Sequence, residues 1–320
     1  MSFSTDTKEE LARIIPENRC CQLAELSGII GAIGSIDLKG RRGLSISLTT
    51  ENPSTARKIF KMIKTTFFIH TEIQVTRANR FRKNKQYRLI VKNTEDSRKV
   101  LQNTELIKIE NDCISLQYDN PVKLLKDEAC KRAFLRGAFL ASGSVSSPEK
   151  NYHLEYVSDR AQHLEHIQQL LKNYGIEGKI IERKGYHVLY IKEGEQIVDL
   201  LNIIGAHNAL LTLENIRILK QMRNDINRIV NCETANLSKT VQASMKQVEM
   251  IKYIDQRIGM EQLSTTLKNI AFARLKYPEA SLKELGEKLD PPIGKSGVNH
   301  RFRKLEQIEK KLRNGKKEIR

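Results

Sequence analysis

A short pattern of small residues occurs twice in this chain and constrains its fold more than any other feature. Residues 28–35 read GIIGAIGS and residues 137–144 read GAFLASGS, so both fit G-x-x-x-A-x-G-S at an offset of 109 residues. Self-similarity at this range indicates a duplicated unit. Each copy follows apolar residues at helical spacing, and its last glycine suits a helix end. The pattern therefore predicts two helices that stop at Gly34 and Gly143.

Each predicted helix has two small residues one turn apart on the same face. They are Gly28 and Ala32 in the first copy, and Gly137 and Ala141 in the second. Small residues at this spacing let another backbone approach closely. Ordinary core packing would explain one copy equally well, but two copies with equivalent flanks favour mutual packing. We therefore expect the two helices to pack against each other across a pseudo-twofold axis.

The segments that follow the two copies also repeat. Each copy is followed by a strand-like run, a helical stretch, a β-hairpin and another helix. The strand-like runs are residues 44–50 and 152–157, and the helical segments are 53–67 and 94–106 in the first half, and 160–174 and 195–204 in the second. The sequence thus predicts an α+β fold in which the order αββαββα is written twice, with an antiparallel sheet in each half.

A helix and glycine motif at a twofold interface, followed by ββαββα, resembles the LAGLIDADG homing-endonuclease fold in its single-chain, two-copy form. With the stretch NCETANLSKT at 231–240 and a basic C-terminal module, the chain resembles the WhiA family of bacterial regulators over nearly its whole length. That family joins a degenerate nuclease-like domain to an all-α helix-turn-helix domain. The resemblance implies a first LAGLIDADG-like half, a second half, a helical connector and a helix-turn-helix domain, at residues 1–118, 119–208, 209–245 and 246–320.

The resemblance also bears on catalysis. Active LAGLIDADG nucleases carry an acidic residue just before the last glycine of each motif, and the two carboxylates hold divalent metal beside the scissile phosphates. Here those positions are Ile33 and Ser142, and the nearest acid, Asp37, has Ser146 as its counterpart. We therefore expect a DNA-binding scaffold without catalytic residues, metal or cofactor. The alternative is a metal-dependent endonuclease that uses relocated acids such as Asp37.

The charge of the chain points to a polyanionic partner. Its 55 Lys and Arg residues exceed its 38 Asp and Glu residues and leave a formal charge of +17. An RNA-binding assembly protein would share this charge, but the stacking aromatic patterns of common RNA modules are missing. The sequence has no apolar run of the roughly 18 residues that a membrane span needs, so no membrane partner is expected. We expect double-stranded DNA as the main partner.

The first fifteen residues predict a capped helix, with Thr5 or Asp6 as N-cap, and not a secretory signal. His163, His166 and His207 show no metal-ligand spacing and are expected at the surface or half-buried. Five cysteines without C-x-x-C spacing argue against structural zinc and favour reduced thiols in the cytoplasm. They are Cys20, Cys21, Cys113, Cys130 and Cys232.

A predicted hairpin in the first half carries a cluster of cations. Its strands are residues 71–77 and 86–91, which alternate as strands do. A cluster of this length without acids repels itself unless it is solvated or matched by phosphates. We expect phosphate contact, with a merely solvated hairpin as the alternative. The expected contact residues are Arg77, Arg80, Arg82, Lys83, Lys85 and Arg88.

The connector is predicted to be an amphipathic helix over residues 209–230, followed by the polar stretch 231–240 with several potential cap residues. The Asn, Ser, Thr and Lys side chains of that stretch could bind phosphate or an adjoining domain. A capped linker is an equally good interpretation.

The C-terminal module predicts a helix-turn-helix. One helix ends near Pro278, a capping box at Ser281 opens a short helix, and residues 290–294 cannot continue it. A basic helix over 296–313 then serves as the expected recognition helix, with a generic helical hairpin as the alternative. Val298, Phe302 and Leu305 are expected to face the core. The expected DNA contacts are Lys295, Ser296, Asn299, His300, Arg303 and Lys304.

Together these observations predict a non-catalytic DNA-binding protein, cytoplasmic and associated with the nucleoid, that regulates transcription. Resemblance to the WhiA family implies roles in cell division, chromosome segregation and, where the organism sporulates, sporulation. It also implies other regulatory or cell-division proteins as further partners.

Overall fold

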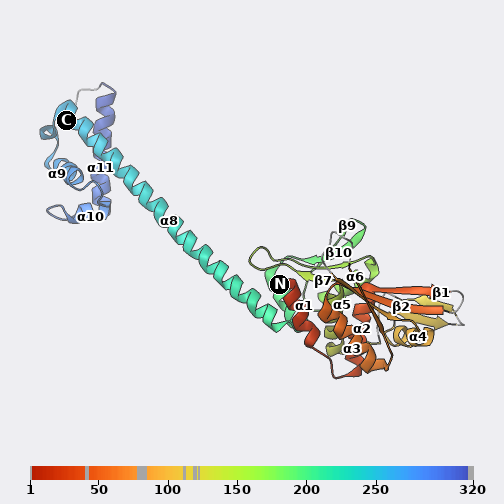
Figure 1. The fold of residues 1–320 in the computed structure, drawn as a ribbon. Coiled ribbons are helices and arrows are strands. Elements are labelled where there is room, and N and C mark those ends of the chain that lie inside the picture. Colours follow the sequence, from red (N-terminus) through yellow and green to blue (C-terminus); the bar gives the residue numbers. More distant parts are fainter. Residues whose placement is uncertain are drawn as a thin grey trace. The chain divides into compact units, whose positions relative to one another are not determined.

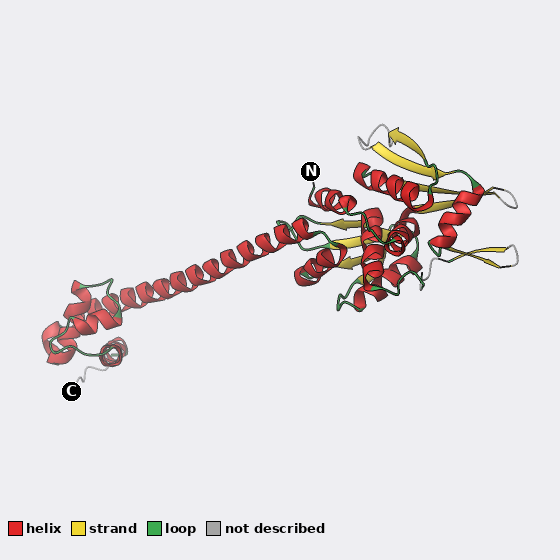
Figure 2. Cartoon of the chain, turned by 90° about the horizontal axis from the view of Figure 1, so that it is seen from below, coloured by secondary structure: helices red, strands yellow, loops and turns green. Residues whose placement is uncertain are grey.

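The computed structural model describes residues 2–39, 43–77, 85–110, 113–117, 121 and 123–315. The chain divides into two compact units, Met1–Lys220 and Gln221–Arg320. Among the described residues the first unit mixes helices with antiparallel sheets, and the second is entirely helical (Figure 2). The finer division into four parts stays a prediction.

The first half of unit 1 begins with two helices and then builds a four-stranded antiparallel sheet. Its elements are α1 (Phe3–Arg13), α2 (Arg19–Ile33), β1 (Gly34–Lys39), β2 (Gly43–Thr50), α3 (Pro53–Phe67), β3 (Glu72–Arg77), β4 (Lys85–Val91) and α4 (Thr94–Asn103). The strand order is β1-β2-β4-β3. Leu44, Ile46 and Leu48 of β2 alternate inward and pack under the helices, as expected for a sheet with one covered face.

The second half repeats this plan. Its elements are α5 (Glu128–Ser142), β7 (Gly143–Val145), β8 (Leu154–Ser158), α6 (Ala161–Lys172), β9 (Lys179–Arg183), β10 (Tyr186–Ile191) and α7 (Gly194–Ile204). The strand order β7-β8-β10-β9 matches that of the first sheet. The predicted duplicated αββαββα fold is confirmed. A short hairpin between the halves, β5 (Ile107–Glu110) with β6 (Cys113–Leu116), was not anticipated by the sequence.

Helices α2 and α5 pack against each other at the centre of unit 1 (Figure 1). A methyl group at Gly28 would collide with the backbone carbonyl of Phe134, and one at Gly137 would collide with that of Glu25. Each glycine thus lies where the opposite backbone passes. Both helices end at the predicted glycine, Gly34 or Gly143, and the chain enters a strand directly. The small-residue interface predicted from the repeat is therefore present.

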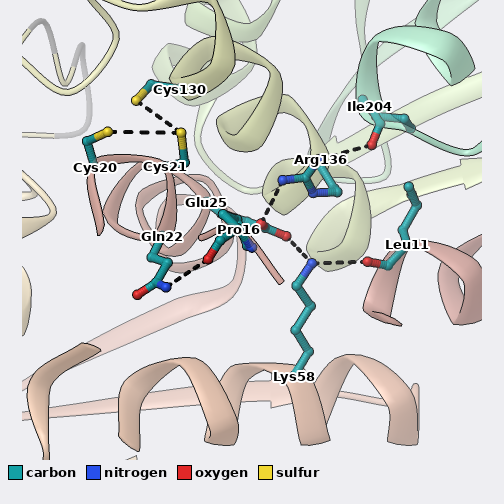
Figure 3. A network of polar contacts seen from close by, with 10 residues as sticks. All are labelled: Leu11, Pro16, Cys20, Cys21, Gln22, Glu25, Lys58, Cys130, Arg136 and Ile204. Atoms are coloured by element: carbon teal, nitrogen blue, oxygen red, sulfur yellow. Dashed lines mark hydrogen bonds and ion pairs between the residues drawn. The ribbon is translucent and has the colours of Figure 1, made fainter. Parts of the chain in front are cut away.

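Buried charges also connect the two halves, close to the helix crossing (Figure 3). Glu25 of α2 is fully buried and pairs with Lys58 of α3 and with Arg136 of α5, the latter at 3.1 Å. Lys58 donates to the Leu11 carbonyl at 3.0 Å, and Arg136 donates to the Ile204 carbonyl at 3.4 Å. Burial lowers the pKa of Lys58 to about 8, against the opposing effect of Glu25. Pairing compensates charges that would be costly to bury alone.

Unit 2 contains the C-terminal part of one long helix and a compact helical module. The elements are α8 (His207–Ile258), which begins in unit 1, the 3₁₀ turn η1 (Met260–Gln262), α9 (Thr265–Lys276), α10 (Leu282–Glu287) and α11 (Lys295–Arg313). Ile251 and Ile254 of α8 pack with Ile270 of α9, Leu285 of α10 and Phe302 of α11. Each short helix of the module thus contributes to one apolar core.

Two expectations about helix limits were wrong. The N-cap of α1 is Ser2, whose hydroxyl accepts from the Thr5 amide, and not Thr5 or Asp6. The predicted break after residue 230 is absent, because α8 runs through residues 231–240 without interruption. No Gly or Pro occurs between His207 and Ile258, and the Thr240 hydroxyl bonds back to the Asn236 carbonyl within the helix. Cap-forming side chains do not by themselves end a helix.

Across the described ranges, every helix is too short or too polar to cross a bilayer.

Candidate DNA-binding surfaces

The two positions that carry acids in LAGLIDADG nucleases lie at the last residues of α2 and α5. Ile33 packs against the core of the first half, and the Ser142 hydroxyl donates to the Ala138 carbonyl of its own helix at 3.1 Å. An aliphatic side chain offers no ligand, and a hydroxyl engaged by its own helix is a poor substitute for a carboxylate. These two positions do not form the anionic pair that nuclease chemistry requires.

A cation from the second half lies beside the first of these positions, a feature that the sequence analysis missed. Arg160, at the start of α6, donates to the carbonyl of Gly31 at 2.9 Å and to that of Gly34. It thereby satisfies carbonyls at the end of α2, where the helix dipole is negative. Because the Arg160 guanidinium is bonded to the carbonyls of Gly31 and Gly34, its positive charge lies close to Ile33. This charge also opposes binding of a divalent cation there. The residue at the equivalent place in the first half is Asn52, the N-cap of α3, so the sequence repeat gave no sign of it.

Asp37, the acid that an alternative nuclease mechanism would use, already has a partner. It lies on β1 and pairs with Arg88 of β4 at 3.9 Å, with both side chains about half exposed. Arg88 also donates to the Ser47 hydroxyl of β2 at 3.1 Å. The acid is thus part of a polar contact across three neighbouring strands.

The uncovered face of the first sheet is polar. Thr49 stands opposite Arg88, and Gln74 stands opposite Arg88 on the other side, so the three side chains share one face. Leu48 and Leu89, which are opposite each other, point to the helix-covered face and are buried. The sheet therefore presents hydroxyl, amide and guanidinium groups, and the Asp37 carboxylate paired with Arg88, on the face away from its helices.

The expected phosphate contacts of the first half are only partly described by the structure. Arg77 ends β3 opposite Lys85, which begins β4 with an exposed side chain, and Arg88 lies further along β4. Both described strands confirm the hairpin. Arg80, Arg82 and Lys83 lie outside the described residues. Phosphate contact by the whole set stays a prediction.

The second sheet presents a different surface in the equivalent place. Glu155 of β8 accepts from the Ser144 hydroxyl at 3.1 Å and lies 3.2 Å from His153. Tyr190, opposite Glu155 in the sheet, stacks on the His153 ring at 5.9 Å between centroids. Glu155 lies at the centre of this face, and the turn between β9 and β10 is only Lys184 and Gly185, so we expect the two halves to contact a polyanion unequally.

The C-terminal module has the expected order of helix, turn and basic helix. Ser281 and Glu284 form the predicted capping box at the start of α10. Gly286 packs against the Ile293 carbonyl so closely that a methyl group there would collide with it. This contact holds the turn against α10 and so fixes where α11 begins at Lys295.

The predicted orientation of α11 is confirmed. Val298, Phe302 and Leu305 are buried in the module core. The six residues expected to contact DNA are all exposed, on the faces of the helix that flank or oppose the buried one: Lys295, Ser296, Asn299, His300, Arg303 and Lys304. Their contact with DNA stays a prediction.

A buried arginine that the sequence analysis overlooked organises the module beneath α11. Arg274 of α9 is 2 % exposed and donates to Gln247 of α8 at 2.9 Å and to the Ala280 carbonyl at 2.6 Å. Its guanidinium also lies 5.6 Å from the centre of the Phe302 ring. One cation thus joins α8, α9, the turn and α11. The sequence showed only a basic residue in the last turn of a helix.

His163 and His166 of α6 are buried, so the expectation of surface or half-buried rings was wrong for both. Their rings lie 5.9 and 5.2 Å from that of Phe134 on α5. Burial lowers the pKa of His163 to about 3 and that of His166 to about 4. Both are therefore neutral packing residues at neutral pH. His207, in contrast, is exposed.

Three family models match successive parts of the chain. They are the WhiA N-terminal LAGLIDADG-like domain over residues 19–107, the WhiA LAGLIDADG-like domain over 131–223 and the WhiA C-terminal HTH domain over 226–309.

Curated relatives match over almost their whole length. "Probable cell division protein WhiA" of Alkaliphilus oremlandii is 53% identical over 317 residues, which cover 99% of both chains. The protein with the same name from Thermoanaerobacter sp. is 50% identical over 313 residues and 98% of both chains. The crystal structure of full-length DUF199/WhiA from Thermotoga maritima matches with a TM-score of 0.61 and 27% identity, over 97% of this chain and 99% of that chain. The chain therefore belongs to the WhiA family.

Proposed function

We propose that this chain is a DNA-binding regulator without nuclease activity, which acts in the control of cell division through transcription. The exposed polar arc of α11 carries the proposal most directly. Three apolar anchors fix the helix, and all six polar residues chosen from the sequence remain open to a partner. A basic helix held in this way is suited to the major groove.

The chemistry of α11 favours DNA over other polyanions. Asn299 and Arg303 lie one turn apart and can pair bidentately with adenine and guanine edges. Lys295 and Lys304 flank them as point charges suited to phosphate. The polar face of the first sheet, with Arg88 at its centre, offers a second surface for backbone contact.

Absence of nuclease activity is supported by the ends of α2 and α5. A metal site would need carboxylates where Ile33 and Ser142 stand, and Arg160 places a guanidinium beside the first of these positions. The role in cell division is proposed from the name of the curated relatives, "Probable cell division protein WhiA". The same proposal places the chain in the cytoplasm, associated with the nucleoid. It also includes other regulatory or cell-division proteins as partners.

Genome-wide crosslinking, followed by sequencing of the bound DNA, is the test. A regulator should be recovered at discrete sites near promoters, and the purified chain should bind those duplexes more tightly than random duplex DNA. The chain with Arg303→Ala should lose the discrete sites while the protein remains folded. Recovery of bound DNA uniformly along the chromosome would contradict a sequence-specific role. If the chain binds RNA more tightly than duplex DNA of equal length, the partner is RNA and not DNA.

A further inference from the structure

Three cysteine thiols meet at the N-terminal ends of the two central helices. Cys20 and Cys21 come from α2 and Cys130 comes from α5, and their side chains point toward one another (Figure 3). The Cys21 sulfur lies 3.5 Å from that of Cys130 and 4.0 Å from that of Cys20. All three sulfurs lie within 4.8 Å of one another. Cys21 and Cys130 occupy equivalent places in the two halves, 109 residues apart.

These separations fit a single coordinated ion. Zinc binds thiolate sulfur at about 2.3 Å, so two sulfurs on one tetrahedral ion lie about 3.8 Å apart. Two of the observed separations are within a few tenths of an ångström of that value. Cys21 and Cys130 are buried whereas Cys20 is exposed, so a fourth position can face solvent. A disulfide, by comparison, would use only two of the sulfurs and would need an oxidant.

The helix ends and the burial of the thiols have opposite effects on the charge of the three sulfurs. All three cysteines lie in the first turn of their helix, where the helix dipole is positive and thiolates are stabilised. In the described chain, neither Asn18 nor Asp127 caps its helix with a side-chain hydrogen bond. Burial raises the pKa of the Cys21 and Cys130 thiols, which opposes the effect of the helix ends, and a coordinated cation would offset the cost of charging these sulfurs.

We propose that Cys20, Cys21 and Cys130 form a trithiolate site for a thiophilic divalent cation, with Zn²⁺ as the probe. The ion joins the N-terminal ends of α2 and α5 and so links the two halves at the end opposite Gly34 and Gly143. Binding replaces three thiol protons with three metal–sulfur bonds and changes no oxidation state. Because the ligands come from both halves, metal binding should stabilise the pairing of the halves.

The test uses the full chain, reduced and stripped of metal, titrated with Zn²⁺ against a chromophoric chelator. The wild type should take up one ion per chain. Cys20→Ser, at an exposed position, should weaken uptake by more than about tenfold, and Cys130→Ser should do the same. Cys232→Ser removes an exposed cysteine of α8 and is the matched control, with uptake unchanged.

Two further readouts come from the same samples. Zn²⁺ should protect Cys20 from alkylation, measured by mass spectrometry, while Cys232 in the same chain reacts as before. It should also raise the melting temperature of the wild type and of Cys232→Ser but not that of Cys20→Ser. Uptake that is unchanged in Cys20→Ser, or a reduced wild type that takes up no zinc against the chelator, would overturn the proposal.

Discussion

Gly28 of α2 lies against the backbone of Phe134 on α5, so closely that a methyl group at Gly28 would overlap the Phe134 carbonyl oxygen. The same hypothetical methyl group would lie 3.0 Å from the Ala138 amide nitrogen. Both neighbours are backbone atoms, which cannot move aside as a flexible side chain does. Contact between the two halves therefore depends on the missing side chain.

The first prediction follows from this contact. Gly28→Ala should lower the free energy of unfolding by at least about 2 kcal/mol, because the overlap outweighs the gain in helix propensity. Gly194→Ala is the matched control, since a methyl group at that first position of α7 meets Tyr152 at an ordinary 3.5 Å. Chemical denaturation measures both. Equal stability of the two variants would show that α2 and α5 can separate at little cost.

The second prediction concerns catalysis. With Mg²⁺ or Mn²⁺ the chain should bind duplex DNA and leave it intact, as measured by linearisation of a supercoiled plasmid that contains a bound site. The variant with both Ile33→Asp and Ser142→Asp should also be inactive, because Arg160 lies where it can pair with the first new carboxylate. Site-specific cleavage by the wild type that disappears in Asp37→Asn would support the nuclease alternative.

The third prediction concerns the cations of the β3–β4 hairpin. Changing Arg77, Arg80, Arg82, Lys83 and Lys85 to Ala should weaken binding to every duplex. It should also flatten the dependence of log K on log salt by about 0.9 per lost phosphate contact. The control removes Lys61 and Lys64, two exposed cations of α3 on the covered side of the same sheet. If both variants keep the wild-type slope, the hairpin is a solvated surface and not a contact.

The fourth prediction concerns pH. The folded pKa values of His163 and His166 lie below the ordinary value of 6.5, so the unfolded chain takes up protons first as pH falls. The contribution of the two neutral rings to the free energy of unfolding of unit 1 should be complete above pH 6.5. Below pH 6.5 it should decrease as the pH falls, by up to about 1.4 kcal/mol per pH unit for each ring. His166→Leu should reduce this slope. A free energy of unfolding that is constant from pH 7 to 5 would mean that both rings are protonated in the folded state.

The sequence predicted those features that leave a local or repeated mark. Glycines at 28 and 137 recur with equivalent flanks, Ser281 and Glu284 have the spacing of a capping box, and the apolar residues of α11 recur at helical intervals. Each pattern lies within one or two helical turns, so it can be recognised from neighbouring residues in the sequence. The duplicated fold, the α2–α5 interface and the exposed arc of α11 followed from them.

Other features depend on residues that only the fold brings together. Cys130 meets Cys21 across 109 residues, and Arg160 reaches the end of α2 from the second half. Metal-ligand spacing within one segment cannot reveal such a cluster. The length of α8 was missed for a different reason: its polar stretch contains residues that cap helices, but a continuous helix forms when neither Gly nor Pro interrupts it.

Paired substitutions at Arg303 and Lys304 test whether α11 reads DNA sequence. Both side chains are exposed on neighbouring positions of the same helix, so neither change should disturb the core. In competition binding, Arg303→Ala should cost about 1–3 kcal/mol at a specific site and much less on random DNA, whereas Lys304→Ala should weaken both about equally. If the two variants instead lower specific and random affinity by the same factor, α11 is only an electrostatic anchor and does not read DNA sequence.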